Sequence, residues 1–117
     1  MRLNEITFND ARPIDGYGPG FFRVAGQVVQ GDVCVLPSGV LPWGGYGDTA
    51  TLIRARGLVD VMFIGTGAEV AHVPAEFRAV LEEAGMAVES MATPAACRTY
   101  NVLLSEGRRV GVALFAV

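Results

Sequence analysis

Two runs of consecutive apolar residues restrict the folds that are open to this chain. Val61 to Ile64 and Val110 to Val117 lack the alternation of apolar and polar residues typical of a strand with one face in water. Parallel strands that are covered on both faces require such runs, because side chains on either side contact protein. The second run has eight residues, whereas a membrane helix needs about 20. The sequence therefore predicts buried strands in a soluble protein without a membrane span.

Helices alternate with strands in the sequence after Asp48. Asp48 can cap a short helix over Thr49 to Arg56, and Gly57 can end it. A longer helix is expected to begin at Pro74 and to end at Gly85. Its apolar residues recur at the spacing of one helical face, which predicts packing on a sheet. This stripe consists of Phe77, Val80, Leu81 and Ala84.

The last helix carries the most informative residues. It follows a strand over Ala87 to Met91, with Thr93 as the expected N-cap, Pro94 at the first helical position and Gly107 after the last turn. At about 100° per residue its apolar and polar residues separate, and Asn101 falls at the edge of the apolar side. The apolar side contains Ala96, Cys97, Tyr100, Leu103 and Leu104, and the polar side contains Arg98, Ser105 and Glu106.

The first third of the chain predicts a β-meander. Turn residues recur there at short spacing. The expected strands are Phe21 to Val24, Gln27 to Gln30 and Val33 to Leu36, with an earlier strand around Glu5 to Phe8 in the same sheet. We interpret Asp15 to Gly20 as a turn and Pro37 to Asp48 as a loop, because both are rich in glycine and proline. The order predicts one α/β domain over residues 1–117, with three layers, an N-terminal β-meander and alternating β-α units around a mixed central sheet.

Composition excludes several functions. All nine basic residues are arginine, and without lysine the chain cannot form a Schiff base, anchor pyridoxal phosphate or make a Walker A contact. The formal charge of −3 and an isoelectric point near 5.0 argue against a nucleic-acid partner. One histidine and two cysteines without a CxxC pair predict no metal site. Without lysine or a complete dinucleotide-binding motif, we also expect no cofactor.

The cysteines and the N-terminus bear on the compartment. Cys34 and Cys97 are far apart in the sequence and predict reduced thiols rather than a disulfide framework. The first fifteen residues carry three acidic residues and no apolar core, so they match neither a secretory signal nor a transit peptide. We therefore expect a cytoplasmic protein.

The turn at Gly65 to Gly67 is one candidate binding site. It follows a predicted strand and imitates part of a dinucleotide-binding fingerprint, but the third glycine of that pattern is replaced by Val70 and the helix begins only near Pro74. A tight turn explains the pattern more simply. A third interpretation is that the amides of Gly65, Thr66 and Gly67 form a small anion site at the sheet edge, where ligands of open α/β sheets bind.

Cys97 is a candidate nucleophile. It lies in the first turn of a helix beside Arg98, where the helix dipole and a cation can lower the pKa of a thiol. Its place on the apolar side favours the alternative of a buried thiol, because a catalytic cysteine needs access and a base. His72 is the one imidazole that could serve as that base, and its position in a loop is more typical of a surface residue.

Two further groups have a structural and a functional interpretation. Thr99, Tyr100 and Asn101 are polar residues on a helix that otherwise packs inward; Asn101 is expected to bond a neighbouring loop such as the Gly65–Gly67 turn, or to hold a ligand there. Trp43 either plugs the β-meander or is an exposed anchor for a protein partner. An open meander edge would favour a homodimer, and a capped edge would favour a monomer.

Four motifs in the same order resemble one family. They are Ile14 to Gly18, Leu36 to Val40 with Trp43, Val61 to Gly67, and Ala95 to Leu104. Together they resemble the Mth-type domain family of unknown function. This family includes small bacterial and archaeal proteins, an animal adipogenesis-associated protein and a mitochondrial assembly factor for respiratory NADH:ubiquinone oxidoreductase. The first residues do not match the organelle presequence expected of the mitochondrial member, so we expect a bacterial-type member and do not carry over the animal compartment.

The resemblance implies a three-layer α/β domain and a role in protein assembly, and it implies no reaction. It favours a non-enzymatic interaction factor that binds subunits of a respiratory complex, with the Trp43 loop and the exposed side of the meander as contact surface. The alternative is a small-molecule site or an enzyme with a pocket between the Gly65–Gly67 turn and the Thr99–Asn101 segment. The residues that match the family's motifs would form the wall of that pocket: Trp43, Gly65, Thr66, Gly67, Thr99, Tyr100 and Asn101. Cys97 and Arg98 are expected to line the same pocket.

Overall fold

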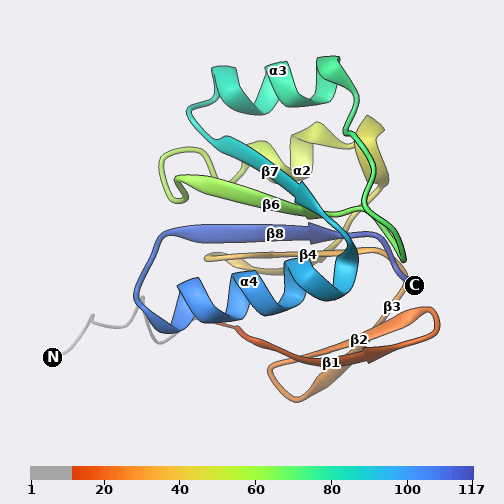
Figure 1. The fold of residues 1–117 in the computed structure, drawn as a ribbon. Helices are drawn as coiled ribbons and strands as arrows, with labels where there is room; N and C mark the ends of the chain where they lie inside the picture. Colours follow the sequence, from red (N-terminus) through yellow and green to blue (C-terminus); the bar gives the residue numbers. More distant parts are fainter. Residues whose placement is uncertain (1–11) are drawn as a thin grey trace, which may run out of the picture.

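A five-stranded mixed sheet forms the centre of the protein, for which the computed structural model describes residues 12–117 (Figure 1). The strand order is β5-β4-β8-β6-β7. β6 runs parallel to β7 and β8, and β4 runs antiparallel to β5 and β8. The strands are β4 (Val33–Leu36), β5 (Gly39–Pro42), β6 (Val61–Gly65), β7 (Ala87–Met91) and β8 (Val110–Leu114). The predicted mixed central sheet is confirmed.

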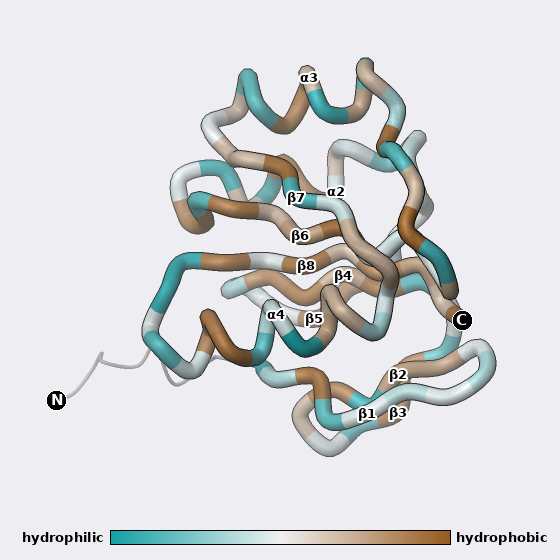
Figure 2. Tube along the Cα trace, in the orientation of Figure 1, coloured by the Kyte–Doolittle hydropathy of each residue, from teal (hydrophilic) through white to brown (hydrophobic). Residues whose placement is uncertain are grey.

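Layers on both faces of the sheet make the fold three layers deep. The short helix α2 (Thr49–Ile53) and α3 (Ala75–Glu83) lie on one face, and α4 (Thr93–Ser105) lies on the other (Figure 1). A 3-10 turn, η1 (Gly45–Gly47), precedes α2. The central strands are apolar along their length (Figure 2), and all five residues of β8 are buried. A sheet that is covered on both faces therefore explains the apolar residues of β6 and β8. The predicted strand over Val110 to Val117 is too long, because β8 ends at Leu114 and Val117 is 36% exposed beyond the sheet.

The second sheet has three strands and packs in the same layer as α4. It consists of β1 (Ile14–Gly18), β2 (Phe21–Val24) and β3 (Gln27–Gln30), in the order β1-β2-β3. Phe22 and Val24 share a buried cluster with Ala96 and Tyr100 of α4. This arrangement covers the face of the central sheet that α4 alone leaves open.

The structure corrects the predicted meander at three places. Val33–Leu36 is not its third strand; this segment is β4, which pairs with β5 and β8 in the central sheet and is therefore buried along its length. The glycine-rich segment expected to be a turn contains strand β1, with a register shift between Ile14 and Gly16 that lets it follow β2. The Pro37–Asp48 loop contains β5. The strand expected around Glu5 to Phe8 lies outside the described residues.

The helices begin and end close to the predicted residues, with three differences. α2 ends at Ile53, three residues before Arg56. In α3, Phe77 and Leu81 are buried, whereas Val80 is 42% exposed. The buried face of α3 is therefore narrower than the predicted apolar stripe. α4 begins at Thr93 itself, whose hydroxyl makes no capping bond. No helix within residues 12–117 is both long and apolar enough to cross a membrane.

Candidate functional site

The amides of Thr66 and Gly67 in the Gly65–Gly67 turn are already bonded within the protein. The N–H of Thr66 donates to the carbonyl of Met91 at 2.9 Å. The N–H of Gly67 donates to Oγ1 of Thr93 at 2.9 Å. An anion site needs donors that are free to turn toward the ligand. The expectation of free amides at this turn is therefore wrong.

Thr93 closes this junction from the other side. Its side chain is fully buried, and its hydroxyl donates to the carbonyl of Phe115 at 2.8 Å while it accepts from Gly67. A Cβ on Gly65 would lie 2.8 Å from Thr93 Oγ1 and 3.0 Å from Thr93 Cα, so only glycine fits there without a shift. One hydroxyl thus joins the ends of β6 and β8 to the first turn of α4. The sequence marked Thr93 as an N-cap and gave no sign of this role.

Asn101 binds β1 and not the Gly65–Gly67 turn, which corrects the expected partner. Its Oδ1 accepts from the N–H of Ile14 at 2.8 Å, and its Nδ2 donates to the carbonyl of Ile14 at 2.8 Å. The neighbouring Tyr100 donates from its hydroxyl to the carbonyl of Arg12 at 3.1 Å. These two side chains hold the three-stranded sheet against α4, because the start of β1 runs beside the middle of this helix.

Cys97 is a buried thiol. Its side chain is 5% exposed, and burial raises its pKa to about 11, although the nearby charge of Arg98 acts in the opposite direction. Cys34 lies in the separate cluster on the other face of the central sheet, and burial raises its pKa to about 12. His72 is exposed in the loop between β6 and α3. The interpretation of Cys97 as a buried residue is confirmed.

Both thiols of the native protein should resist alkylation by iodoacetamide at neutral pH, because the thiolate is the reactive form and neither sulfur is accessible. Mass spectrometry should show two modified cysteines only after unfolding in denaturant, which serves as the control. Rapid modification of Cys97 in the folded chain would contradict its burial.

The raised thiol pKa also predicts a pH dependence. The unfolded thiol of Cys97 ionises near its ordinary pKa of 9.0, whereas the folded one stays protonated to about 11. The unfolded state therefore loses a proton first, and the free energy of unfolding should fall as pH rises from about 9 to about 11. Denaturant titrations of the wild type and Cys97→Ala across this range measure the effect, which the variant should show more weakly.

Trp43 is buried on the side of α2 and α3, away from the three-stranded sheet. It is 4% exposed, and its ring centroid lies 4.8 Å from that of Phe115 and 5.9 Å from that of Tyr46. Its Nε1 donates to the carbonyl of Asp48 at 3.2 Å. The indole is thus part of the buried core, but it packs on the α2 and α3 face of the central sheet and not against the three-stranded sheet, where it was expected. An exposed anchor for a partner requires an accessible ring, so this interpretation of Trp43 is wrong.

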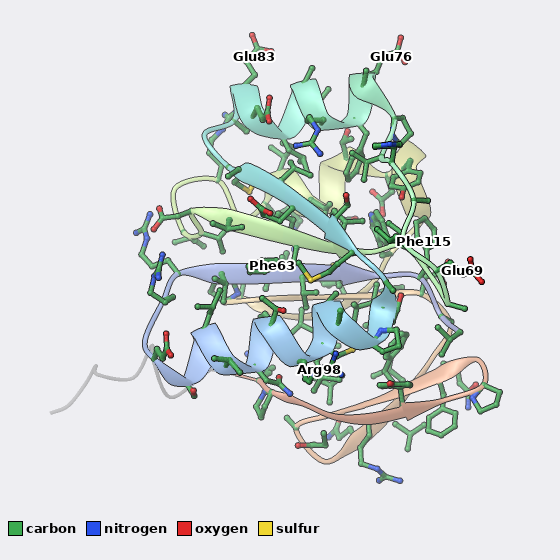
Figure 3. The ribbon with its side chains drawn as sticks, in the orientation of Figure 1. Phe63, Glu69, Glu76, Glu83, Arg98 and Phe115 are labelled. Atoms are coloured by element: carbon green, nitrogen blue, oxygen red, sulfur yellow. The ribbon has the colours of Figure 1, made fainter. Side chains whose placement is uncertain are left out.

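The outer surface of α4 has a shallow hollow, which we call the α4 hollow. It has a volume of about 280 Å³ and is lined by Arg98, Thr99, Val102 and Leu103. Val102 is 54% exposed, and Arg98 projects from the same helix (Figure 3). Within residues 12–117 the ion pairs are Arg78 with Glu82 and Arg109 with Asp60, so Arg98 has no carboxylate partner there.

Within the part of the chain that the structure describes, no three His, Cys, Asp or Glu side chains gather where they could hold a metal ion. Of the predicted site residues, the structure brings Arg98 and Thr99 together at the α4 hollow. Tyr100 and Asn101 instead bond the main chain at the start of β1, and Cys97 is buried in the core. The Gly65–Gly67 turn bonds Thr93.

Comparison with known proteins identifies relatives across most of the chain. A family model described as a protein of unknown function, DUF498/DUF598, matches residues 14–115. An uncharacterized protein of Rhodobacter capsulatus is 49% identical over 114 residues, which are 97% of this chain and 92% of the relative. NADH dehydrogenase (ubiquinone) 1 alpha subcomplex assembly factor 3 of Danio rerio is 36% identical over 110 residues, or 86% of this chain. The chain spans 62% of the length of this relative and 59% of its human counterpart.

Solved structures share the fold. A crystal structure described as an outer membrane protein from Bartonella henselae superposes with a TM-score of 0.82 at 39% identity, covering 90% of this chain and 94% of that one. A Bordetella pertussis protein described as a Mth938-like domain superposes with a TM-score of 0.74 at 28% identity, covering 98% and 92%. These similarities confirm the resemblance to the Mth-type domain that the four motifs indicate.

Proposed function

The chain belongs to the DUF498/DUF598 family, and we propose that it is a non-enzymatic protein-binding factor that acts in the assembly of a respiratory NADH dehydrogenase. The names of the animal relatives, which are assembly factors of NADH dehydrogenase, support a role in the assembly of this complex. The two buried thiols, which carry raised pKa values and form no disulfide, support a place in the reducing cytoplasm.

The internal use of the polar groups favours binding over catalysis. Tyr100 and Asn101 are occupied by the main chain of β1, and Thr93 is occupied by two main-chain groups. A nucleophile needs a base within hydrogen-bond reach and a free path for the substrate. Cys97, buried and protonated at neutral pH, offers neither.

The α4 hollow is the observation that carries the proposal. Val102 is a large apolar side chain that is half exposed, and Arg98 is an exposed cation beside it. Burying Val102 under a partner would remove apolar surface from water. A carboxylate on the same partner would complement Arg98 and orient the encounter. The partner that fits is therefore a subunit segment with an apolar side chain next to an Asp or Glu.

Charge reversal at Arg98 tests this proposal. Tagged full-length chain should capture NADH dehydrogenase subunits from extracts of the native cell, and Arg98→Glu should reduce the captured amount on the order of tenfold, because it sets like charges against each other across the contact. Quantitative mass spectrometry of the captured proteins measures the change.

Arg56→Glu is the matched control. Arg56 is exposed between Ala55 and Val59, which pack in the buried cluster on the α2 and α3 face of the central sheet, and its reversal changes the net charge equally. We expect capture by this variant to equal that of the wild type. Absence of these subunits from the wild-type capture, or an equal loss with Arg56→Glu, would refute the proposed contact.

A further inference from the structure

Within residues 12–117, β3 is an edge strand that has only one of the usual protections against pairing, its length of four residues. Within the described chain it pairs with β2 alone, at the edge of the three-stranded sheet. Edge strands are commonly protected by being very short, by charged residues or proline, by a bulge, or by a covering helix or loop. The sequence of β3 is Gln27-Val28-Val29-Gln30, which contains no charge, no proline and no glycine, and Val28 is 50% exposed. Its pairing with β2 is regular, without a bulge.

The hairpin register shows which main-chain groups of β3 point outward. The connection to β2 is the two-residue turn Ala25-Gly26, with φ of 48° and 84°, the conformation of a primed turn. In such a hairpin the closing residues, Val24 and Gln27, exchange hydrogen bonds, and the next pair does not. The N–H and C=O groups of Val28, and by the same alternation those of Gln30, therefore point away from β2. No turn or loop hydrogen bond within residues 12–117 uses these groups.

We propose that β3 pairs antiparallel with β3 of a second copy of this chain. The outward groups of Val28 would bond those of the partner's Gln30, and those of Gln30 would bond the partner's Val28. This register places Val29 opposite the partner's Val29 across a two-fold axis. The two three-stranded sheets would then form one continuous sheet of six strands, and the β3 edge of each would be covered.

The chemistry of β3 favours a second copy over a foreign strand. Two uncharged strands of the same sequence meet without like-charge repulsion, which a charged edge would impose. The register pairs identical valines at the non-hydrogen-bonded position, where side chains across strands approach most closely. Arg23, on the neighbouring strand, stays three strand spacings, roughly 14 Å, from its counterpart, which is beyond the screening length of physiological salt. This surface is separate from the α4 hollow, and the inference does not depend on the proposed function.

Disulfide trapping tests the register. Val29→Cys should form a crosslinked dimer under mild oxidation, because residues in a directly opposed pair bring their Cβ atoms close to disulfide distance. Val28→Cys is the matched control, since two copies of residue 28 would be diagonal neighbours about 7–8 Å apart in this register. The native cysteines contribute little background because both are buried. We expect Val29→Cys to crosslink on the order of tenfold faster than Val28→Cys.

The oligomeric state of variants without an introduced cysteine, measured by analytical ultracentrifugation, gives an independent test. The wild type should shift from monomer to dimer as its concentration rises, and Val28→Pro should remain monomeric because proline removes the outward N–H without breaking the ladder to β2. Val28→Thr keeps this N–H and should dimerise as the wild type does. Equal crosslinking rates for Val28→Cys and Val29→Cys, or a wild type that stays monomeric at all concentrations, would overturn the proposal.

Discussion

Replacing Trp43 with alanine should lower the free energy of unfolding by about 3–5 kcal/mol. The indole is almost fully buried, and its ring packs against Tyr46, Phe77 and Phe115. Removing it leaves a cavity between η1, α3 and the end of the central sheet, and it also leaves the carbonyl of Asp48 without its donor. Urea denaturation followed by circular dichroism measures the loss.

Trp43→Phe is the control for this prediction. Phenylalanine keeps an aromatic ring in the cluster and loses the hydrogen bond from Nε1, so we expect a loss of about 1–2 kcal/mol. If Trp43→Ala unfolded at the same denaturant concentration as the exposed Val102→Ala, the indole would not be part of the core. Reduced partner capture by Trp43→Ala would report unfolding, which is why Arg98 is the better position for testing the contact.

Thr93→Val should lower the free energy of unfolding by about 2–4 kcal/mol. Valine has nearly the shape of threonine, so the packing of the fully buried side chain is retained. The change removes the hydroxyl that accepts from Gly67 and donates to Phe115, and it leaves a donor and an acceptor without partners. Each such group costs about 1–3 kcal/mol when it stays out of contact with water.

Thr93→Ser separates the hydroxyl from the methyl group. Serine keeps both hydrogen bonds and loses one buried methyl, which is worth about 1 kcal/mol. The same urea titration should therefore place Thr93→Ser between the wild type and Thr93→Val. The reverse order would mean that the methyl, and not the hydroxyl, stabilises the junction of β6, β8 and α4.

β6 and β8 could be predicted from the sequence because burial on both faces leaves a local signal, whereas β5, which is only half-buried, was missed within the Pro37–Asp48 segment. Val61–Gly65 and Ala87–Met91 were within one residue of the prediction. β1 gave no such signal, since its glycines are typical of a turn and its pairing with β2 depends on a register shift that only the assembled sheet produces. β4 was predicted as a strand but in the wrong sheet, because a strand's partners depend on β8, which lies some 80 residues later.

Side-chain roles that depend on local helical spacing could likewise be predicted, whereas roles that depend on distant segments could not. The helical spacing of α4 correctly separates buried Ala96, Cys97 and Tyr100 from exposed Arg98. It places Asn101 at the edge of the buried side but cannot identify the strand that runs past it. The burial of Trp43 and the contacts of Thr93 likewise arise from segments that are distant in the sequence.

The two hydrogen bonds between Asn101 and Ile14 can form only after α4 has been synthesised, which bears on when β1 docks during folding. The side-chain amide of Asn101 serves the main chain of β1 as a neighbouring peptide group would, across a separation of 87 residues. β1, β2 and β3 are linked by short turns and can pair soon after they leave the ribosome, whereas docking of this sheet has to wait until α4 is made. We therefore expect the nascent chain to carry an exposed apolar hairpin until α4 and β8, which both contribute to the buried cluster around Phe22 and Val24, have been made.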